Sequence, residues 1–360
     1  MAEFYAQKIL DGDVYERIIK SANHQEGDRV PIWDLIDNRA VYEYFAPGEK
    51  DILKASVKVY QGLGIDLCRG IAYPPSQEEE GRTSEAGEFA YAVEGQTVWL
   101  KERPFKTIKD IANYRPYIPS KEEIMDNWVP EMKRWVEAFA PRVMYVPGCG
   151  VGLDAARHSI GFELFTYAIY DAPDEINRIL NDHMEIGRRY AEAMAESRLC
   201  PLAFIWDDIA YKGGTMYSPR WLRENWVPRL KYIVEPLKEA GIKVIFHSDG
   251  NLLEIVDDLI SAGVDGLNPL EQLAGMDLEL LKKKWGDKLI LVGGIDCSQL
   301  LPLGTPEEIR EKVKWALKVA GPGGGFFIGS SSEIVPSTPL ENVLTFYQAI
   351  HEFGKYPINL

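Results

Sequence analysis

Short apolar runs that end in polar residues dominate the chain from residue 200 onward. The runs are rich in β-branched and aromatic residues and lack the two-residue alternation of a half-exposed strand, so they predict strands buried on both faces. Each run is followed by a stretch with the spacing of an amphipathic helix. The predicted strands cover residues 202–206, 244–246, 266–270, 289–292 and 326–328.

Helix start signals separate these strands. Ser218-Pro219 opens one helix, with the hydroxyl as N-cap and the proline at the first helical position. Thr305-Pro306-Glu307-Glu308 and Thr338-Pro339-Leu340-Glu341 have the spacing of capping boxes. Strands joined by single helices pair in parallel through right-handed crossovers, so the pattern predicts an α/β fold with a parallel sheet.

The first half of the chain adds three predicted strands, at residues 30–35, 65–71 and 143–146. Eight strands are the number in a (β/α)8 TIM barrel, which we predict as a single domain over residues 1–360. An open doubly wound sheet is the competing architecture. It is disfavoured because no GxGxxG motif stands at a strand-to-helix turn, and the glycine-rich residues 321–325 precede a strand.

Two segments do not follow the repeat. Residues 89–105, FAYAVEGQTVWLKERPF, alternate like a β-hairpin around Glu94-Gly95. We expect residues 74–118 to form an insertion over the barrel mouth that contains this β-hairpin. Residues 1–27 read as an N-terminal helical segment that covers the bottom of the barrel or packs on its side.

The formal net charge of −15 argues against nucleic acid and anionic membranes as partners, because both would be repelled. The four cysteines are far apart and form no CxxC pair, so we expect buried, reduced thiols. The sequence has no apolar stretch of the roughly 20 residues that span a bilayer and no signal peptide, which predicts a soluble, cytoplasmic protein. The oligomeric state stays open, and a homodimer is compatible with the sequence.

Polar residues at the predicted strand ends are the candidates for chemistry, because barrels of this type carry their sites at the carboxyl ends of the strands. Carboxylates gathered there repel one another and raise each other's pKa, and a bound cation would relieve this. Histidine with carboxylates suits zinc or a similar divalent ion. Alternatively, each carboxylate caps a helix or pairs with a nearby Lys or Arg. The candidates are Asp34, Asp37, Asp207, Asp208, His247, Asp249, Asn268, Glu271, Asp296, Cys297 and Glu333.

His247 and Asp249 are two residues apart, so both can face the lumen from one extended chain. The adjacent Asp207 and Asp208 could serve as general acid and base, but neighbours on a strand point to opposite faces, so we expect only one in the lumen. Aromatic and soft side chains near strand ends are compatible with an aromatic guest, although core packing also explains each of them. They are Trp33, Tyr73, Trp206, Tyr211 and Met216, and with Asp34 and Cys297 they form the predicted substrate pocket.

Several stretches resemble the uroporphyrinogen decarboxylase superfamily, which includes corrinoid-dependent methyltransferases. They are WDDIAYKGGTMYSPRWL, FHSDGN, LNPLEQLAGMDLELLKKKWGDKLILVGGIDCSQLLPLGTPEEI, GGGFFIGSSSEIVPSTPLENV and, more weakly, DRVPIWDL. The resemblance implies a (β/α)8 barrel. The decarboxylases carry an RQAGR-like motif after the first strand, whereas this chain has WDLIDNRAVYEY with Arg39 alone. Porphyrinogen decarboxylation is therefore disfavoured.

The thiol-methylating members of the superfamily hold zinc through His-x-Cys on the fifth strand and a Cys after the eighth. His247 matches the histidine, whereas Asp249 and Ser332 stand at the cysteine positions. The resemblance thus implies a metal with nitrogen and oxygen ligands. Glu333, beside the second cysteine position, is the expected third ligand, with Glu271 and Asp208 as alternates.

Members without these cysteines look like the substrate-side methyltransferases of anaerobic O-demethylase systems. The resemblance implies that the protein moves a methyl group from a methoxylated aromatic compound to the cobalt of a corrinoid-binding partner protein. The chain has no DxHxxG motif, so the corrinoid would come from that partner. Two alternatives stay open: a superfamily enzyme of other chemistry, such as a decarboxylase or a methyltransferase for another O- or N-methyl donor, and a non-catalytic barrel that binds a tetrapyrrole or a partner protein.

Overall fold

Eight parallel strand positions close into a barrel in the computed structural model, which describes residues 3–71, 83–86, 89–94, 97–103 and 105–360. Six strands form one parallel sheet in the order β13-β12-β11-β10-β7-β6. Their bounds are β6 Gly148–Gly150, β7 Leu202–Trp206, β10 Lys243–His247, β11 Gly266–Asn268, β12 Ile290–Ile295 and β13 Phe326–Ser330.

The remaining positions complete the ring. Strand β1, Leu67–Cys68, pairs in parallel with β5, Met144–Tyr145. The chain before β1 bridges β13 and β1 through Ile32 and Trp33. Strands β5 and β6 are two parts of one barrel position, interrupted at Val146-Pro147, where proline lacks the N–H that a ladder needs. The predicted (β/α)8 barrel is confirmed.

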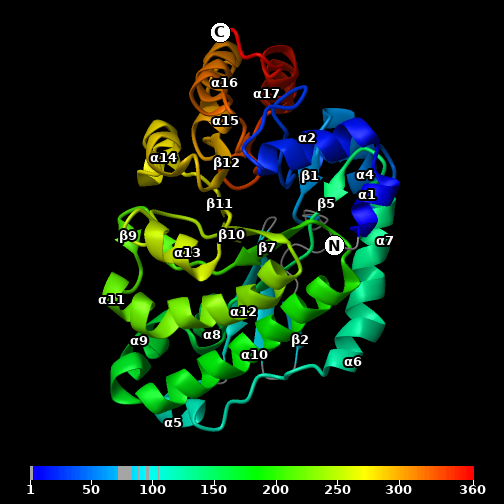
Figure 1. Ribbon diagram of the computed structural model, residues 1–360. Helices are drawn as coiled ribbons and strands as arrows, with labels where there is room; N and C mark the ends of the chain where they lie inside the picture. Colours follow the sequence, from blue (N-terminus) through cyan, green and yellow to red (C-terminus); the bar gives the residue numbers. More distant parts are fainter. Residues whose placement is uncertain (1–2, 72–82, 87–88, 95–96, 104) are drawn as a thin grey trace.

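Helices surround the strands, with α16 and α17 at one end of the view in Figure 1 and α10 and α12 at the other. The longer helices are α4 Ile52–Leu63, α7 Val129–Phe139, α8 Leu153–Ile160, α9 Phe162–Asp171, α10 Pro173–Ser197, α12 Val227–Glu239, α14 Leu278–Trp285, α16 Pro306–Ala320 and α17 Leu340–Phe353. The shorter elements are α3 Arg39–Phe45, α5 Ile108–Ile111, α6 Lys121–Glu123, η2 Ile124–Trp128, α11 Pro219–Trp221, η3 Leu222–Trp226, α13 Val256–Ala262, η4 Gln272–Ala274 and α15 Leu300–Leu303.

Two of the three predicted helix starts form as expected. Ser218 Oγ accepts from the amide of Trp221, and Thr305 and Glu308 form the predicted capping box. The capping box predicted at Thr338 was wrong. Helix α17 begins after Pro339 without a side-chain cap, while the Thr338 carbonyl accepts from the Asn38 amide at 2.9 Å.

The N-terminal helices α1, Tyr5–Ile9, and α2, Gly12–Ala22, pack beneath the barrel. They bury a stripe of apolar residues against inward-facing strand residues such as Phe204, Ile245 and Phe327. Ser21 Oγ also donates to the carbonyl of Phe326, the first residue of β13. The stripe consists of Ala6, Leu10, Val14, Ile18 and Ala22.

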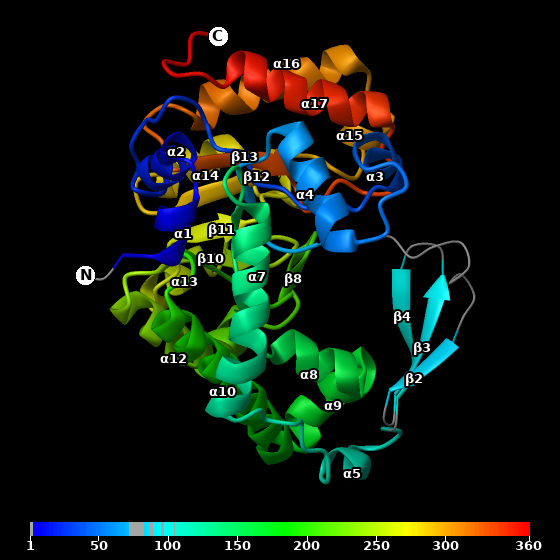
Figure 2. The same cartoon turned by 90° about the vertical axis from the view of Figure 1, so that its right-hand side faces the viewer.

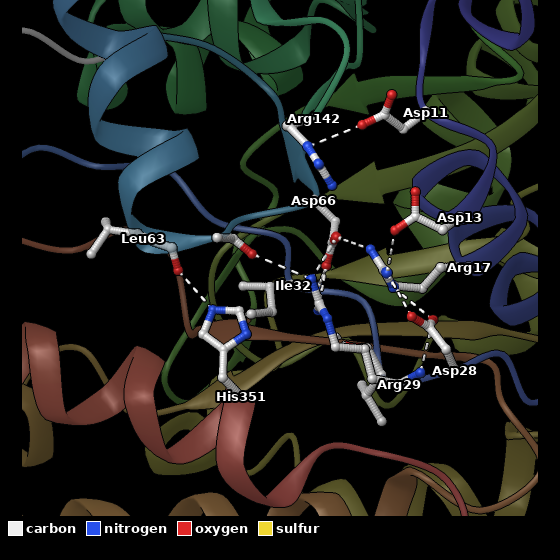
Figure 3. Close-up of polar contacts among 12 residues, drawn as sticks. Asp11, Asp13, Arg17, Asp28, Arg29, Ile32, Leu63, Asp66, Arg142 and His351 are labelled. Atoms are coloured by element: carbon white, nitrogen blue, oxygen red, sulfur yellow. Dashed lines mark hydrogen bonds and ion pairs between the residues drawn. The ribbon is translucent and has the colours of Figure 1, made fainter.

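Charged residues tie these helices to the bottom of the barrel (Figure 3). Asp66 accepts from Arg17 Nη1 at 2.8 Å and from Arg29 Nη1 at 2.7 Å, and it also caps the amide of Ile32 at 2.8 Å. Arg17 reaches on to Asp28, with Nη2 2.6 Å from Oδ2. In barrels of this type the bottom face serves stability, and the reactive site lies at the other end.

Three antiparallel strands stand outside the barrel: β2 Thr83–Ala86, β3 Phe89–Glu94 and β4 Thr97–Glu102. Figure 2 shows them beside the helical shell, between α3 and α5. The pairing of β3 with β4 agrees with the alternating sequence pattern. That residues 74–118 form an insertion over the mouth stays a prediction. A second small pair, β8 Ala210–Tyr211 and β9 Gly214–Thr215, follows β7.

Candidate metal centre

The side chain of His247 ends strand β10 at the carboxyl edge of the barrel, where it is almost fully buried. Its Nδ1 lies 2.8 Å from the side-chain oxygen of Asn268 on the neighbouring strand β11. Because an amide oxygen only accepts, Nδ1 carries the proton and Nε2 keeps a free lone pair. Burial and the nearby Arg69 lower the pKa of His247 to about 3, so the imidazole is neutral at pH 7.

Two carboxylates face this nitrogen. Asp208 Oδ1, from the loop after β7, and Asp249 Oδ1, from the loop after β10, each lie 4.0 Å from His247 Nε2. One potential ligand atom from each of the three residues lies within 4.8 Å of the others. Asp208 Oδ1 also accepts from the amide of Asp249 at 3.0 Å, which holds the two loops together.

Asp249 is the residue of this trio whose surroundings would be most improved by a cation. Its Oδ1 is buried and has no hydrogen-bond partner among the residues that the structure describes. Burial, followed by the charges of Asp208, Glu271 and Glu333, raises the pKa of Asp249 to about 7. A divalent ion would neutralise the carboxylates and satisfy this oxygen. One imidazole and two carboxylates are a donor set that zinc accepts, since catalytic zinc commonly has three protein ligands and one open position.

A glycine makes the geometry of the HSDG loop possible. Gly250 has φ +89°, and a Cβ there would come within 2.4 Å of the Tyr211 amide nitrogen. The loop after β10 therefore passes directly against the β8 hairpin, and this holds Asp249 close to Asp208.

Asp208, named as an alternate third ligand, is the residue that joins His247 and Asp249. Glu333, our first choice, lies outside this trio. Its Oε2 accepts from Ser332 Oγ at 2.7 Å and is 3.6 Å from Arg69 Nη2. Glu271 is engaged by the amide of Gly250.

Arg69 is a residue of this site that our sequence reasoning missed. It directly follows β1, its guanidinium lies 5.1 Å from the ring centre of Phe204, and Nη2 donates to the carbonyl of Ser332 at 3.1 Å. Its charge lowers the pKa of His247 and opposes the rise at Asp249. The signal was available, because Arg69 lies in the predicted strand 65–71 near its carboxyl end.

Asp207 and Asp34 have their oxygens engaged by the protein. Asp207 is buried and accepts hydrogen bonds from Trp226 Nε1 at 2.7 Å and from the amide of Leu153 at 2.9 Å. Because Leu153 is the first residue of α8, Asp207 caps the N-terminus of that helix. Burial raises the pKa of Asp207 to about 7. Asp34 accepts from Ser330 Oγ at 2.6 Å and from a buried tyrosine hydroxyl at 2.8 Å. Burial raises its pKa to about 6.

The predicted aromatic residues divide between core and mouth. Trp33 is buried inside the barrel and stacks on Phe327. Trp206 and Tyr211 are exposed at the end of β7, and Met216 accepts from Arg157 Nη1 in the same loop region.

Cys297 and Tyr73 are the other two residues of the predicted substrate pocket. Cys297 is buried against Ser331, and burial raises the pKa of its thiol to about 11. Tyr73 lies outside the described residues.

All four cysteines are buried free thiols, as expected. Within the described part of the chain, no helix is both long and apolar enough to cross a membrane.

Comparison with known proteins connects this barrel to one family. The family model described as uroporphyrinogen decarboxylase (URO-D) matches residues 89–353. A protein of Methanosarcina acetivorans named methylcobamide:CoM methyltransferase MtbA is 28% identical over 336 residues, which cover 91% of this chain and 94% of that one. A uroporphyrinogen decarboxylase of Coxiella burnetii is 34% identical over 275 residues, 71% of each chain.

The extent of these matches varies. The chain spans 60% of the length of the Methanosarcina barkeri methylcobamide:CoM methyltransferase MtaA. Among solved structures, a methyltransferase from Methanosarcina mazei superposes with a TM-score of 0.70 at 20% identity, covering 94% of this chain and 98% of that one. The structural likeness supports the fold, and the family model covers well over half of the sequence. The chain belongs to the uroporphyrinogen decarboxylase (URO-D) family and has relatives named methylcobamide:CoM methyltransferase.

Proposed function

We propose that this protein is a methyltransferase that moves a methyl group from a methoxylated aromatic compound to the cobalt of a separate corrinoid protein. The observation that carries the proposal is the trio of His247, Asp208 and Asp249, which offers one nitrogen and two carboxylates within 4.8 Å. Relatives named methylcobamide:CoM methyltransferase support a corrinoid as the partner of methyl transfer, although in their reaction the methylated corrinoid is the donor, and the acceptor role here is part of our proposal.

The donor set favours an oxygen substrate. Thiolate ligands donate strongly and leave zinc a weak Lewis acid, suited to a soft thiol. Imidazole and carboxylate leave more positive charge on the ion, which suits a hard ether or alkoxide oxygen. Asp249 at the position of a thiolate in the thiol-methylating members therefore favours an ether over a thiol.

The protein's own residues would prepare this site before substrate arrives. Asn268 holds the His247 ring so that Nε2 faces the carboxylates, a role typical of groups that support metal ligands. Asp208 and Asp249 would supply the anionic ligands. When bound, a divalent ion such as zinc supplies Lewis-acid stabilisation of the oxygen from which the methyl group departs.

Charge balance at the departing oxygen is the role we assign to Arg69. Its guanidinium lies near enough to the trio to affect the pKa of both His247 and Asp249. As the C–O bond breaks, the electron pair stays on the oxygen, and a fixed cation in a partly buried site stabilises that charge. The methyl carbon forms its new bond to cobalt(I), a strong nucleophile that needs no protein base.

The proposal is tested by an assay of methyl transfer from a panel of methoxylated aromatic compounds to a reduced corrinoid protein. The loss of the cobalt(I) absorbance monitors the transfer. The His247→Ala variant should lose both stoichiometric metal and methyl transfer, while its circular dichroism spectrum stays that of the wild type. His158→Ala, on the exposed face of α8, is the matched control and should retain both. Full activity of His247→Ala in metal-free buffer would refute the proposal.

Decarboxylation is the second candidate, because relatives of comparable identity are named uroporphyrinogen decarboxylase. The absence of an RQAGR-like motif after the first strand argues against it. Release of carbon dioxide from a porphyrinogen, with no methyl transfer from any methoxylated compound, would decide for this alternative.

A further inference from the structure

A cavity of about 300 Å³ lies between strand β6 and helix α10, and Trp206, at the end of the strand next to that of His247, is part of its lining. Aromatic rings line it from three elements: Trp128 from η2, Tyr190 from α10 and Trp206 from the end of β7. The rings of Trp128 and Tyr190 meet edge to face with centroids 5.2 Å apart. Ligand pockets in proteins begin at about this volume and are mostly apolar, as this one is.

Glycines create the space. Gly150 ends β6 beside Trp206, and a Cβ there would lie 3.3 Å from Trp206 Nε1. Gly187 lets α10 approach the strand, because a Cβ there would lie 2.5 Å from the carbonyl oxygen of Gly150. Side chains at these two positions would fill the cavity or push the helix away.

Trp206 connects the cavity to the metal centre. It is 41% exposed, and its ring lies 6.0 Å from that of Phe204. The His247 ring lies 5.2 Å from the same phenyl ring, and Trp206 and His247 are direct neighbours in the β7–β10 register. Trp206 is therefore the residue through which the cavity borders the strand end that carries His247.

The cavity lining includes a buried polar atom that has no hydrogen-bond partner among the described residues. His183 Nε2 is buried and makes no hydrogen bond to any residue that the structure describes. Burial lowers the pKa of His183 to about 4, so the side chain is uncharged at pH 7. The described residues that line the cavity then carry no formal charge. A buried carboxylate would find no cation there, and a charge without a partner is costly to bury.

We propose that this cavity is the ring subsite of the enzyme and that it takes an uncharged phenolic ring whose hydroxyl bonds to His183 Nε2. The inference rests on the proposed function and narrows its substrate class to neutral methoxyphenols. A cavity of about 150 Å³ is enough to hold benzene, so twice that volume accommodates a ring with two substituents. A hydroxyl can donate or accept, so it suits either tautomer of His183.

Binding is tested by calorimetry without corrinoid, using 2-methoxyphenol, methoxybenzene and 4-methoxybenzoate as ligands. The wild type should bind 2-methoxyphenol more tightly than methoxybenzene and should not bind the benzoate measurably. Ala155→Trp, which fills the cavity from the exposed face of α8, should abolish binding of 2-methoxyphenol. Ala40→Trp, on the exposed face of α3 and away from the cavity, is the matched control and should leave binding unchanged.

The hydrogen bond is tested by His183→Leu. The net free energy of a typical hydrogen bond corresponds to a change in binding affinity of about 2- to 12-fold. The His183→Leu variant should therefore bind 2-methoxyphenol more weakly by that factor and should bind methoxybenzene with unchanged affinity. Equal weakening of both ligands would overturn the assigned role of His183. Wild-type affinity in Ala155→Trp, or no binding of 2-methoxyphenol by the wild type, would overturn the subsite itself.

The same measurements separate this inference from the proposed function. Binding requires neither turnover nor the corrinoid protein. If 2-methoxyphenol binds as described but is never demethylated, the subsite stands and the methyl-transfer proposal falls. If demethylation proceeds normally in Ala155→Trp, the methyl-transfer proposal stands and the subsite is refuted.

Discussion

Replacing Asp66 by Asn tests how the N-terminal helices hold the barrel closed from below. Asp66 is only 2% exposed and accepts from Arg17 Nη1, Arg29 Nη1, Arg29 Nη2 and the amide of Ile32, all between 2.7 and 2.8 Å. Asp66→Asn keeps the shape of the side chain but removes its charge and turns one acceptor into a donor. Two guanidinium groups, of which Arg17 is 6% exposed, then lose a buried counter-charge.

The expected loss is about 3 kcal/mol in the free energy of unfolding. Removing one partner of a buried pair typically costs about 3–5 kcal/mol, and the lower end applies because Arg17 retains Asp28 at 2.6 Å. For a domain of this size each kcal/mol shifts the melting temperature by about 1–2 °C, so a fall of about 4 °C is expected. Urea titration followed by circular dichroism gives the free energy, and differential scanning calorimetry gives the melting temperature.

Asp28→Asn is the matched control. Asp28 also pairs with Arg17, but its side chain is 55% exposed, so its removal should cost no more than about 1 kcal/mol. Metal content at the opposite end of the barrel should be unchanged in both variants. The reasoning fails if Asp66→Asn stays within 0.5 kcal/mol of the wild type, about the size of an ordinary surface substitution, or if the two variants cost the same.

Three further predictions concern the metal centre. Asp208→Asn should remove bound zinc as completely as His247→Ala does, whereas Glu333→Gln should retain it; the reverse result, by metal analysis, would make Glu333 the third ligand. The raised pKa of Asp249, about 7, means that a proton competes with the ion at lower pH, so zinc affinity should fall by up to about tenfold per pH unit below 7. The neutral His247 adds nothing to this slope above pH 4, and Asp249→Asn should flatten the profile measured with a competing chelator. Arg69→Met should tighten zinc binding by about fivefold, because it removes an electrostatic repulsion between the guanidinium and the ion of about 1 kcal/mol. The same variant should slow methyl transfer. Weaker zinc binding in Arg69→Met would contradict this reasoning.

The sequence alone was enough to predict the barrel and the edge on which the candidate metal centre lies. Buried parallel strands need unbroken apolar runs, and the polar residues that end those runs fall at one rim whatever the details of packing. The same local logic paired His247 with Asp249, because two residues apart on an extended chain face the same way. The structure places the buried Oδ1 of Asp249, which has no hydrogen-bond partner among the described residues, 4.0 Å from His247 Nε2.

Tertiary structure decided which groups meet across strands. Asp207 and Asp208 are equivalent in a one-dimensional pattern, but packing of Trp226 and α8 engages the first and leaves the second to face His247. The sequence placed Trp33 among the predicted pocket residues at the barrel mouth, yet its side chain packs inside the barrel. How far along the barrel axis this side chain lies depends on the stagger of adjacent strands. Strand stagger and helix packing follow from contacts between residues tens to hundreds of positions apart, and no local periodicity records them. The sequence pattern puts Arg69 near a strand end, but only the tertiary structure shows that its guanidinium reaches Phe204 and Ser332.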